Sequence, residues 1–327
     1  MEIRLSIIIP FYNAAQYIGE CIESLYKQNI KESEFEVICV NDCSPEQESK
    51  KVILGLQQKH SNIVLIEHGI NKMTGGARNT GLEKAKGKYV WFIDSDDFIE
   101  QNSVAKMLEI AEKNCLDILE FNAMHYYKNR TEVHSIRQNS DVITGIDFIF
   151  DKEEKYEYKS NSTWCKFFLR DFLNTNHIRF QEKVRYEDVL HSFVSRIYAE
   201  RYMFVNDVVY HYRFNSGSYT QTLDASKIID FYNDNILVLG ELIKNKLKIE
   251  SCGYNIEGVY NYYWKIINNY KPLFNLTQKE LRKFIQQKAK LKIDVLDIPI
   301  NNFSFMYRYP FLLILASWVV NLIKKLR

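Results

Sequence analysis

The chain has 327 residues, which predicts one large domain and a smaller appendage, because single hydrophobic cores rarely grow beyond about 250–300 residues. Its 43 basic and 41 acidic residues nearly balance, which argues against a nucleic-acid partner and leaves any anionic ligand to a local site. The six cysteines form no C-x-x-C pair, so we expect a reducing compartment, without disulfides or a zinc site.

Four short apolar runs mark the first hundred residues, at 5–9, 35–40, 62–67 and 88–93. None of them alternates with polar residues, so each is predicted to be a strand that is buried on both faces. Amphipathic segments lie between them, starting at Ile18 and at Gln47, and predict helices. This alternation predicts an α/β, Rossmann-like fold with a mostly parallel sheet flanked by helices. Such sheets bind ligands at the carboxyl ends of their strands, so functional residues are expected directly after the runs.

The pattern of predicted elements changes after residue 100. The segments predicted there are a helix from 104, a strand over 116–127, a loop or hairpin over 129–140, a mixed part over 163–213 that ends in a strand, and helices from 225 onward. We therefore expect a first domain over 1–224, with halves 1–100 and 101–224, and a helical region over 225–327.

Acidic residues follow two of the predicted strands. Asp42 comes after the second strand, and Asp94, Asp96 and Asp97 come after the fourth. The alternation of side chains along the fourth strand is expected to place Asp94 and Asp96 on one side and Asp97 on the other. Two carboxylates on one side suit a hard divalent cation that takes further ligands from substrate phosphates. Helix caps and turns are the structural alternative, because aspartate favours both.

Three stretches together resemble glycosyltransferase family 2 enzymes of the GT-A fold. They are SIIIPFYN, VNDCSP and GGARNTGLEKAKGKYVWFIDSDD, and the resemblance that they carry spans residues 1–100. The sequence departs from the family pattern at Cys43, where glycine is usual, which leaves Asp42 in place and puts only the loop conformation in question.

The resemblance implies a donor site in the first hundred residues. Asp42 is expected to accept a hydrogen bond from the nucleobase, and Asp96 to bind Mn²⁺ or Mg²⁺. Arg78 is expected to place a cation near the phosphates or the base, and a solvent-exposed arginine is its structural alternative. The other residues expected to bind the donor are Pro10, Tyr12, Asn13, Asp94 and Ser95.

The second half carries further landmarks of capsule- and exopolysaccharide-type family members. Residues 163–166, 178–180 and 186–190 resemble their W-x-K, I-x-F and E-D-x-x-F elements. By this resemblance Asp188 is the general base and Glu187 orients it or holds the acceptor. A helix that begins at Glu187 is the structural alternative.

A Tyr-His-Tyr-Arg stretch near the end of the mixed part also resembles the family. His211 is expected to be a further ligand of the metal or the phosphate, and Arg213 is expected to clamp the diphosphate. A structural histidine between tyrosines is the alternative for His211.

The C-terminal segment 303–327 is apolar and ends in basic residues. Its uninterrupted part, 310–323, is shorter than the ~20 residues that cross a bilayer, so we expect an interfacial helix, with a packed core helix as the alternative. The N-terminal run is too short for a signal peptide and ends at Pro10. We therefore expect a cytoplasmic protein that lies peripherally on the inner face of the membrane.

These observations predict a metal-dependent, inverting glycosyltransferase. It would move a sugar from a nucleotide-sugar onto a hydroxyl of a glycan or lipid-linked glycan in cell-surface polysaccharide synthesis, and family frequency favours UDP as the nucleotide. A nucleotidyltransferase and an inactive nucleotide-sugar-binding scaffold are the alternatives. The chain has no G-x-x-x-x-G-K-[ST] or G-x-G-x-x-G motif, which disfavours nucleotide hydrolysis and dinucleotide redox chemistry.

Overall fold

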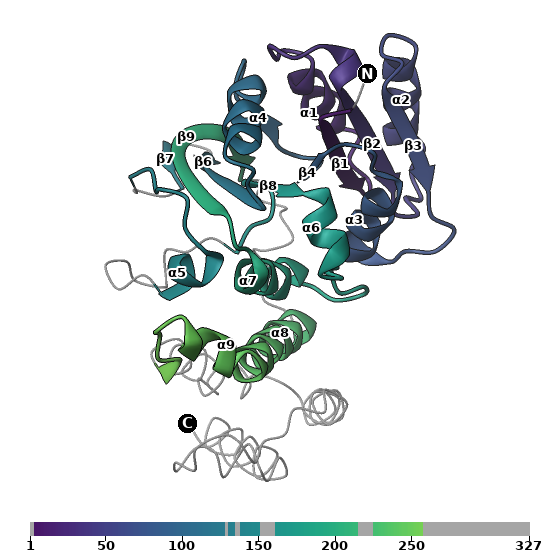
Figure 1. Cartoon of the computed structure of the whole chain (residues 1–327). Coiled ribbons are helices and arrows are strands. Elements are labelled where there is room, and N and C mark those ends of the chain that lie inside the picture. Colours follow the sequence, from purple (N-terminus) through teal and green to yellow (C-terminus); the bar gives the residue numbers. More distant parts are fainter. Residues whose placement is uncertain (1–2, 128–129, 135–137, 151–160, 215–224, 258–327) are drawn as a thin grey trace, which may run out of the picture. The chain divides into compact units, whose positions relative to one another are not determined.

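The structure, a computed structural model, describes residues 3–127, 130–134, 138–150, 161–214 and 225–257 (Figure 1). The chain divides into two compact units, Met1–Ser218 and Tyr219–Arg327. The predicted boundary after residue 224 stays a prediction. The predicted membrane-associating segment 303–327 lies outside the described residues.

The described part of the first unit is built on one sheet. Its strands are β1 (Leu5–Phe11), β2 (Phe35–Asn41), β3 (Ile63–Glu67), β4 (Tyr89–Phe92), β5 (Phe98–Ile99), β6 (Ile118–Tyr127), β7 (Arg130–Val133), β8 (Lys166–Leu169) and β9 (Tyr202–Arg213). The strand order is β3-β2-β1-β4-β8-β6-β9-β5, and β7 pairs with β6 as the predicted hairpin.

Strand direction brings distant segments to one edge of this sheet. Strands β1 to β4 are parallel, β8 is antiparallel to both β4 and β6, and β9 is parallel to β6. The carboxyl ends of β1, β4, β6 and β9 therefore share an edge with the amino end of β8. Residues of both predicted halves meet at this edge.

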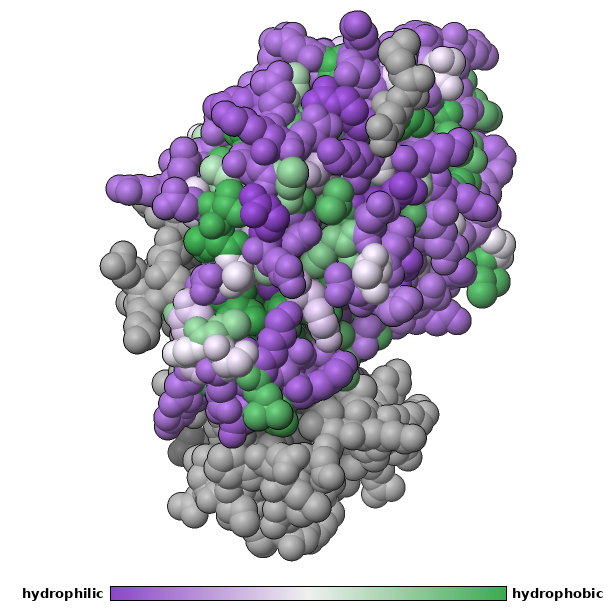
Figure 2. Space-filling model, viewed as in Figure 1, coloured by the Kyte–Doolittle hydropathy of each residue, from purple (hydrophilic) through white to green (hydrophobic). Residues whose placement is uncertain are grey.

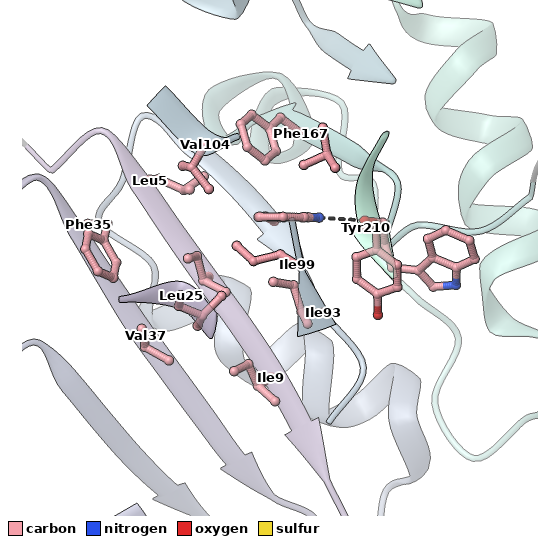
Figure 3. Close-up of a cluster of buried hydrophobic side chains, with 14 of the residues drawn as sticks. Leu5, Ile9, Leu25, Phe35, Val37, Ile93, Ile99, Val104, Phe167 and Tyr210 are labelled. Atoms are coloured by element: carbon pink, nitrogen blue, oxygen red, sulfur yellow. Dashed lines mark hydrogen bonds between the residues drawn. The ribbon is translucent and has the colours of Figure 1, made fainter. Parts of the chain in front are cut away.

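Helices cover both faces of the sheet (Figure 1). In the first unit they are α1 (Ile18–Leu25), α2 (Glu48–Gln57), α3 (Met73–Lys84), α4 (Val104–Lys113), α5 (Gly145–Phe150), α6 (Arg170–Thr175) and α7 (Glu187–Tyr198), with a 3₁₀ turn at Glu32–Glu34. Alternation along β1 separates two cores: Ile7 and Ile9 pack with α1, α2 and α4, whereas Ile8 packs with α3 and α6. Figure 3 shows part of the first core, from Leu5 to Tyr210.

The predicted mostly parallel sheet flanked by helices is confirmed, and two local predictions are wrong. Strand β3 is not buried on both faces, because it lies at the edge of the sheet and leaves Val64 41% exposed. The fourth strand ends at Phe92, so strand alternation does not reach the acidic residues. Residues 94–97 instead form a turn in which the Asp97 amide donates to the Asp94 carbonyl oxygen at 3.2 Å.

The described part of the second unit contains α8 (Ala225–Lys244) and α9 (Lys246–Ser251). Val238, Leu242 and Ile249 are buried there. Across the described ranges, none of the helices combines the length and the apolarity of a membrane span. In the view of Figure 2 the surface is mostly hydrophilic, with hydrophobic residues in small groups.

Candidate active site

The turn after β4 presents its carboxylates in two ways. Asp97 is 1% exposed, and its carboxylate accepts hydrogen bonds from the Tyr210 hydroxyl at 2.6 Å and the Arg213 amide at 2.7 Å. Burial raises the pKa of Asp97 well above its usual value, and the charges of Asp96 and Asp94 add to this. Asp97 therefore anchors the turn to β9, as its structural alternative predicted. Asp94, Ser95 and Asp96 are partly exposed on the same turn.

Arg78 connects this turn to the start of α7. Its Nη2 lies 2.6 Å from Asp94 Oδ1, and its Nη1 lies 2.6 Å from Glu187 Oε1. The residue is only 3% exposed, so the solvent-exposed alternative is excluded. Gly75 lets helix α3 pack closely against the backbone of Gln181, because a Cβ atom at Gly75 would lie 2.1 Å from the Gln181 carbonyl oxygen. Arg78 is thus a buried cation shared by carboxylates from two distant segments.

Asp188 lies beside this bridge in the first turn of α7. Burial, followed by the charge of Glu187, raises the pKa of Asp188 to about 7, although Arg78 partly opposes the shift. The pKa of Glu187 is also raised, because its burial outweighs the attraction of Arg78. Helix α7 begins at Glu187, as the structural alternative for this residue predicted. The same helix start also brings the carboxylates of Glu187 and Asp188 to the site. A carboxyl group with a pKa near 7 is suited to exchange protons at neutral pH.

A second group of contacts surrounds Asp42, after β2. This residue is 3% exposed, and its Oδ1 accepts hydrogen bonds from His68 Nδ1 and the Lys72 amide, both at 2.8 Å. Tyr12, after β1, is 51% exposed, and the Asn13 amide donates to Ser44 Oγ at 3.1 Å. Pro10, by contrast, is buried within β1. Of these predicted donor-binding residues, Asp42, Tyr12 and Asn13 therefore follow two neighbouring strands.

The departure at Cys43 has a backbone explanation. The φ angle of Cys43 is +64°, in the left-handed region that glycine adopts without steric cost. Loop 41–44 holds this conformation with cysteine in place, and Asn41 Oδ1 accepts a hydrogen bond from the Ser44 amide at 2.9 Å. The substitution therefore strains the loop without displacing the carboxylate of Asp42.

His211 and Arg213 make contacts of their own at the end of β9. His211 Nε2 lies 2.9 Å from Glu100 Oε2, its ring stacks on Phe98, and its Nδ1 is buried without a hydrogen-bond partner among the described residues. Arg213 Nη2 lies 2.9 Å from Glu20 Oε2. Neither residue is in contact with Arg78 in the described structure, and their predicted ligand roles stay predictions.

The donor set at the turn suits a hard cation with few protein ligands. Asp94 and Asp96 provide carboxylate oxygens, which Mg²⁺ and Mn²⁺ accept. The described residues contain no group of three or more His, Cys, Asp or Glu side chains arranged to hold a metal. Asp94 and Asp96 are thus the two carboxylates of this turn that could hold a cation.

Sequence reasoning missed two residues of the site. His68 follows the third apolar run directly, so the rule that functional residues come after the runs could have found it. Phe180 belongs to the I-x-F element, and its ring lies 5.2 Å from the Arg78 guanidinium and stacks on His191 at 3.8 Å. No pattern in the sequence indicates that second contact.

Comparison with known proteins places the chain in a family. The sequence profile of Glycosyl transferase family 2 matches residues 6–176, which is more than half of the chain. The uncharacterized glycosyltransferase EpsJ of Bacillus subtilis (strain 168) is 30% identical over 66% of this chain and 63% of its own length. The poly(ribitol-phosphate) beta-N-acetylglucosaminyltransferase TarS of Staphylococcus aureus (strain MW2) is 26% identical over 75% of this chain and 41% of its own length. The chain thus spans less than two thirds of either relative.

Solved structures share the fold. S. aureus TarS 1-349 in complex with UDP-GlcNAc is 22% identical, with a TM-score of 0.66 over 87% of this chain and 81% of that one. The mannosyltransferase PcManGT from Pyrobaculum calidifontis, in complex with GDP-Man and Mn²⁺, is 16% identical, with a TM-score of 0.56 over 99% of this chain and 88% of that one. The likeness to TarS confirms the predicted GT-A fold.

Proposed function

The chain belongs to glycosyl transferase family 2, and from this premise we propose that it moves a sugar from a nucleotide-sugar donor to an acceptor hydroxyl, with inversion at the anomeric carbon. The observation that carries the proposal is the Arg78 bridge, which joins the acidic turn after β4 to the carboxylates at the start of α7. Donor-binding and base-catalysing groups are thereby held in one cluster.

In the proposed mechanism Asp188 is the general base. Its carboxylate takes the proton of the acceptor hydroxyl while the oxygen attacks the anomeric carbon from the face opposite the leaving nucleotide. A pKa of about 7 matches this task, because the base is then half deprotonated near neutral pH. Glu187 is less suited, since Arg78 holds its carboxylate, and it orients Asp188 or the acceptor.

The donor is proposed to lie along the carboxyl edge between β2 and β4. Asp42, Pro10, Tyr12 and Asn13 receive the nucleobase, and the turn at 94–96 receives the ribose and diphosphate. A divalent cation held by Asp96, when bound, neutralises charge on the departing diphosphate. Arg78 adds a permanent positive charge.

Further donor contacts are assigned to β9. Arg213 and His211, near the end of that strand, are proposed to reach the diphosphate or its cation. UDP is the proposed nucleotide because solved relatives carry UDP and UDP-GlcNAc.

The proposed acceptor is a hydroxyl on a glycan or lipid-linked glycan of a cell-surface polymer. Support comes from relatives whose names include poly(ribitol-phosphate) glycosyltransferases and a minor teichoic acid biosynthesis protein. A position on the inner face of the membrane belongs to the same proposal and rests on the apolar, cation-flanked sequence 303–327. Family membership disfavours the nucleotidyltransferase alternative.

Calorimetric titration of UDP with and without Mn²⁺ tests the donor site. We expect Mn²⁺ to strengthen UDP binding, and Asp96→Ala to remove this gain because the cation loses a charged ligand. Asp171→Ala is the matched control, since the Asp171 side chain is 80% exposed on α6. A metal-dependent gain that survives Asp96→Ala would refute the assignment of Asp96.

A turnover measurement distinguishes an active glycosyltransferase from an inactive nucleotide-sugar-binding scaffold. We expect the wild-type protein with Mn²⁺ to hydrolyse UDP-GlcNAc or another nucleotide-sugar slowly when no acceptor is present, because water replaces the acceptor hydroxyl. The measurement is release of the free nucleoside diphosphate (UDP, GDP or dTDP) from each donor in a panel of UDP-, GDP- and dTDP-sugars. Binding of UDP without turnover of any of these donors would favour the inactive scaffold.

A further inference from the structure

His68 connects the buried carboxylate of Asp42 to helix α3. It follows β3, where its amide donates to the Asn41 carbonyl oxygen at 2.9 Å. Its Nδ1 lies 2.8 Å from Asp42 Oδ1, and its Nε2 lies 2.9 Å from Thr80 Oγ1 on α3. The His68 side chain is 7% exposed, so both contacts lie in a site shielded from water. The imidazole is thereby fixed at both nitrogens.

The two oxygens of Asp42 are unequally used. Oδ1 accepts from both His68 Nδ1 and the Lys72 amide, whereas Oδ2 has no hydrogen-bond partner among the described residues. Asn71 also holds the backbone, since its side-chain amide donates to the Asp42 carbonyl oxygen at 2.9 Å. The carboxylate is therefore rigidly oriented, with one oxygen left to accept a hydrogen bond.

Two exposed apolar side chains lie in segments next to the Asp42 loop. Tyr12 after β1 is 51% exposed, and Ile70, in the loop between His68 and Lys72, is 62% exposed. Both lie in segments that contact the Asp42 loop and leave large apolar surfaces uncovered. An aromatic heterocycle can cover such surfaces while its edge meets the carboxylate.

We propose that His68 is a positioning residue that presents Asp42 as an accepting carboxylate, so that the site selects nucleobases with a ring N–H. Uracil presents such an N–H at N3, whereas cytosine presents a lone pair there, which would oppose Oδ2. A buried acceptor that meets another acceptor loses its hydrogen bond and its solvation together. The inference rests on the proposed function and adds to it the group that sets base selection.

The position of the hydrogen between His68 and Asp42 supports this role of His68. A carboxylate only accepts hydrogen bonds, so His68 Nδ1 carries the hydrogen that lies between it and Asp42. In the neutral imidazole, Nε2 is then an acceptor, and the Thr80 hydroxyl can donate to it. That hydroxyl also lies 3.1 Å from the Gly76 carbonyl oxygen, which offers it a second acceptor. The contact with Thr80 on α3 holds the plane of the ring, and the contact with Asp42 places a hydrogen on Nδ1.

The test uses the full chain, with UDP and CDP as matched pyrimidine probes in the presence of Mn²⁺. We expect His68→Ala to weaken UDP binding about tenfold and to reduce the preference for UDP over CDP by a similar factor, because a hydrogen bond to a charged group is lost. His68→Asn should restore both values, since its amide nitrogen takes the place of Nδ1. His68→Gln should not, since its amide nitrogen takes the place of Nε2.

Controls separate the possible outcomes. His60 precedes β3, at the opposite end of the strand from His68, and contacts Glu32. We expect His60→Gln to leave UDP and CDP binding unchanged. Melting temperatures show whether each variant is folded. If the wild-type protein binds no nucleotide, the proposed function fails. If it binds UDP and His68→Ala keeps both the affinity and the preference, the role of His68 is wrong. If His68→Asn and His68→Gln restored UDP binding equally, the assignment of the positioning contact to His68 Nδ1 would likewise be rejected.

Discussion

Helix α7 takes part in two buried charge clusters, one near each end, and the two are balanced differently. Near its C-terminal end, Glu120 Oε2 is approached by Arg196 Nη2 at 2.9 Å and Lys166 Nζ at 3.3 Å, and it also accepts from the Tyr202 hydroxyl. At its N-terminal end, the guanidinium of Arg78 is shared by Asp94 and Glu187, with Asp188 beside them.

The difference separates a structural cluster from a functional one. Two cations and a phenol surround one carboxylate at Glu120, so its negative charge is fully compensated. At the other end the guanidinium of Arg78 contacts two of three neighbouring carboxylates, which leaves an excess of negative charge. Burial, followed by the charge of Glu187, raises the pKa of Asp188, and the charges of Arg78 and Lys166 only partly oppose this rise. A cluster whose negative charge exceeds its positive charge is suited to take up a proton or a cation. The following predictions test this contrast.

Asp188→Asn should have the largest effect. Replacing the proposed base with a neutral amide of the same shape should lower kcat by roughly 10²–10⁴-fold, because general base catalysis contributes about that much. UDP affinity with Mn²⁺ should be unchanged, since Asp188 itself makes none of the proposed contacts with the donor. Steady-state turnover and calorimetry measure the two effects.

Glu187→Gln serves as the matched control for this variant, since it keeps an acceptor for Arg78 beside the base. We expect its loss of kcat to be smaller. Near-normal turnover of Asp188→Asn would eliminate Asp188 as the base.

Glu120→Gln should mainly affect folding. It leaves Arg196 and Lys166 buried without a counter-charge, which typically costs about 3–5 kcal/mol of unfolding free energy. Urea denaturation measures the change. Glu187→Gln should cost less, because Arg78 keeps its contact with Asp94. Equal losses in the two variants would contradict the contrast between the clusters.

The pH dependence of stability should reveal the raised pKa of Asp188. Its folded pKa of about 7 exceeds the unfolded value of about 3.9, so the folded state holds this proton more tightly. Its contribution to stability is therefore present at low pH and lost as pH rises from about 4 to about 7. Asp188→Asn should remove this loss and be more stable than the wild type above pH 7, by up to about 4 kcal/mol. Parallel stability curves for the two proteins would rule out the shift.

Cys43→Gly should have the smallest effect, on the donor side of the site. Glycine adopts the +64° φ angle without the cost that a side chain incurs, so unfolding free energy should rise by about 1 kcal/mol. Cys43→Ala is the control, since it removes the sulfur but keeps the Cβ atom, and should bring no such gain. Thermal and urea unfolding measure both variants.

The sequence alone predicted the local elements well, for a physical reason. Apolar runs and helical spacing are local signals, and the edge rule then placed Asp42 and Asp94 at strand ends. Predictions failed where burial depends on neighbours. Strand β3 has the composition of an inner strand but has only one neighbour, and the turn at 94–97 ends the strand alternation before the acids.

The sequence by itself determined the family, the order of the elements and the acidic residues of the candidate site, because these are carried by short motifs and local periodicity. Only the tertiary structure decided how the residues are charged and paired. Arg78 and Glu187 are 109 residues apart, and Asp42 and His68 are 26 apart, so no local pattern could join them. The raised pKa of Asp188 likewise depends on burial and on the charges of Glu187, Arg78 and Asp94, which the fold alone brings together.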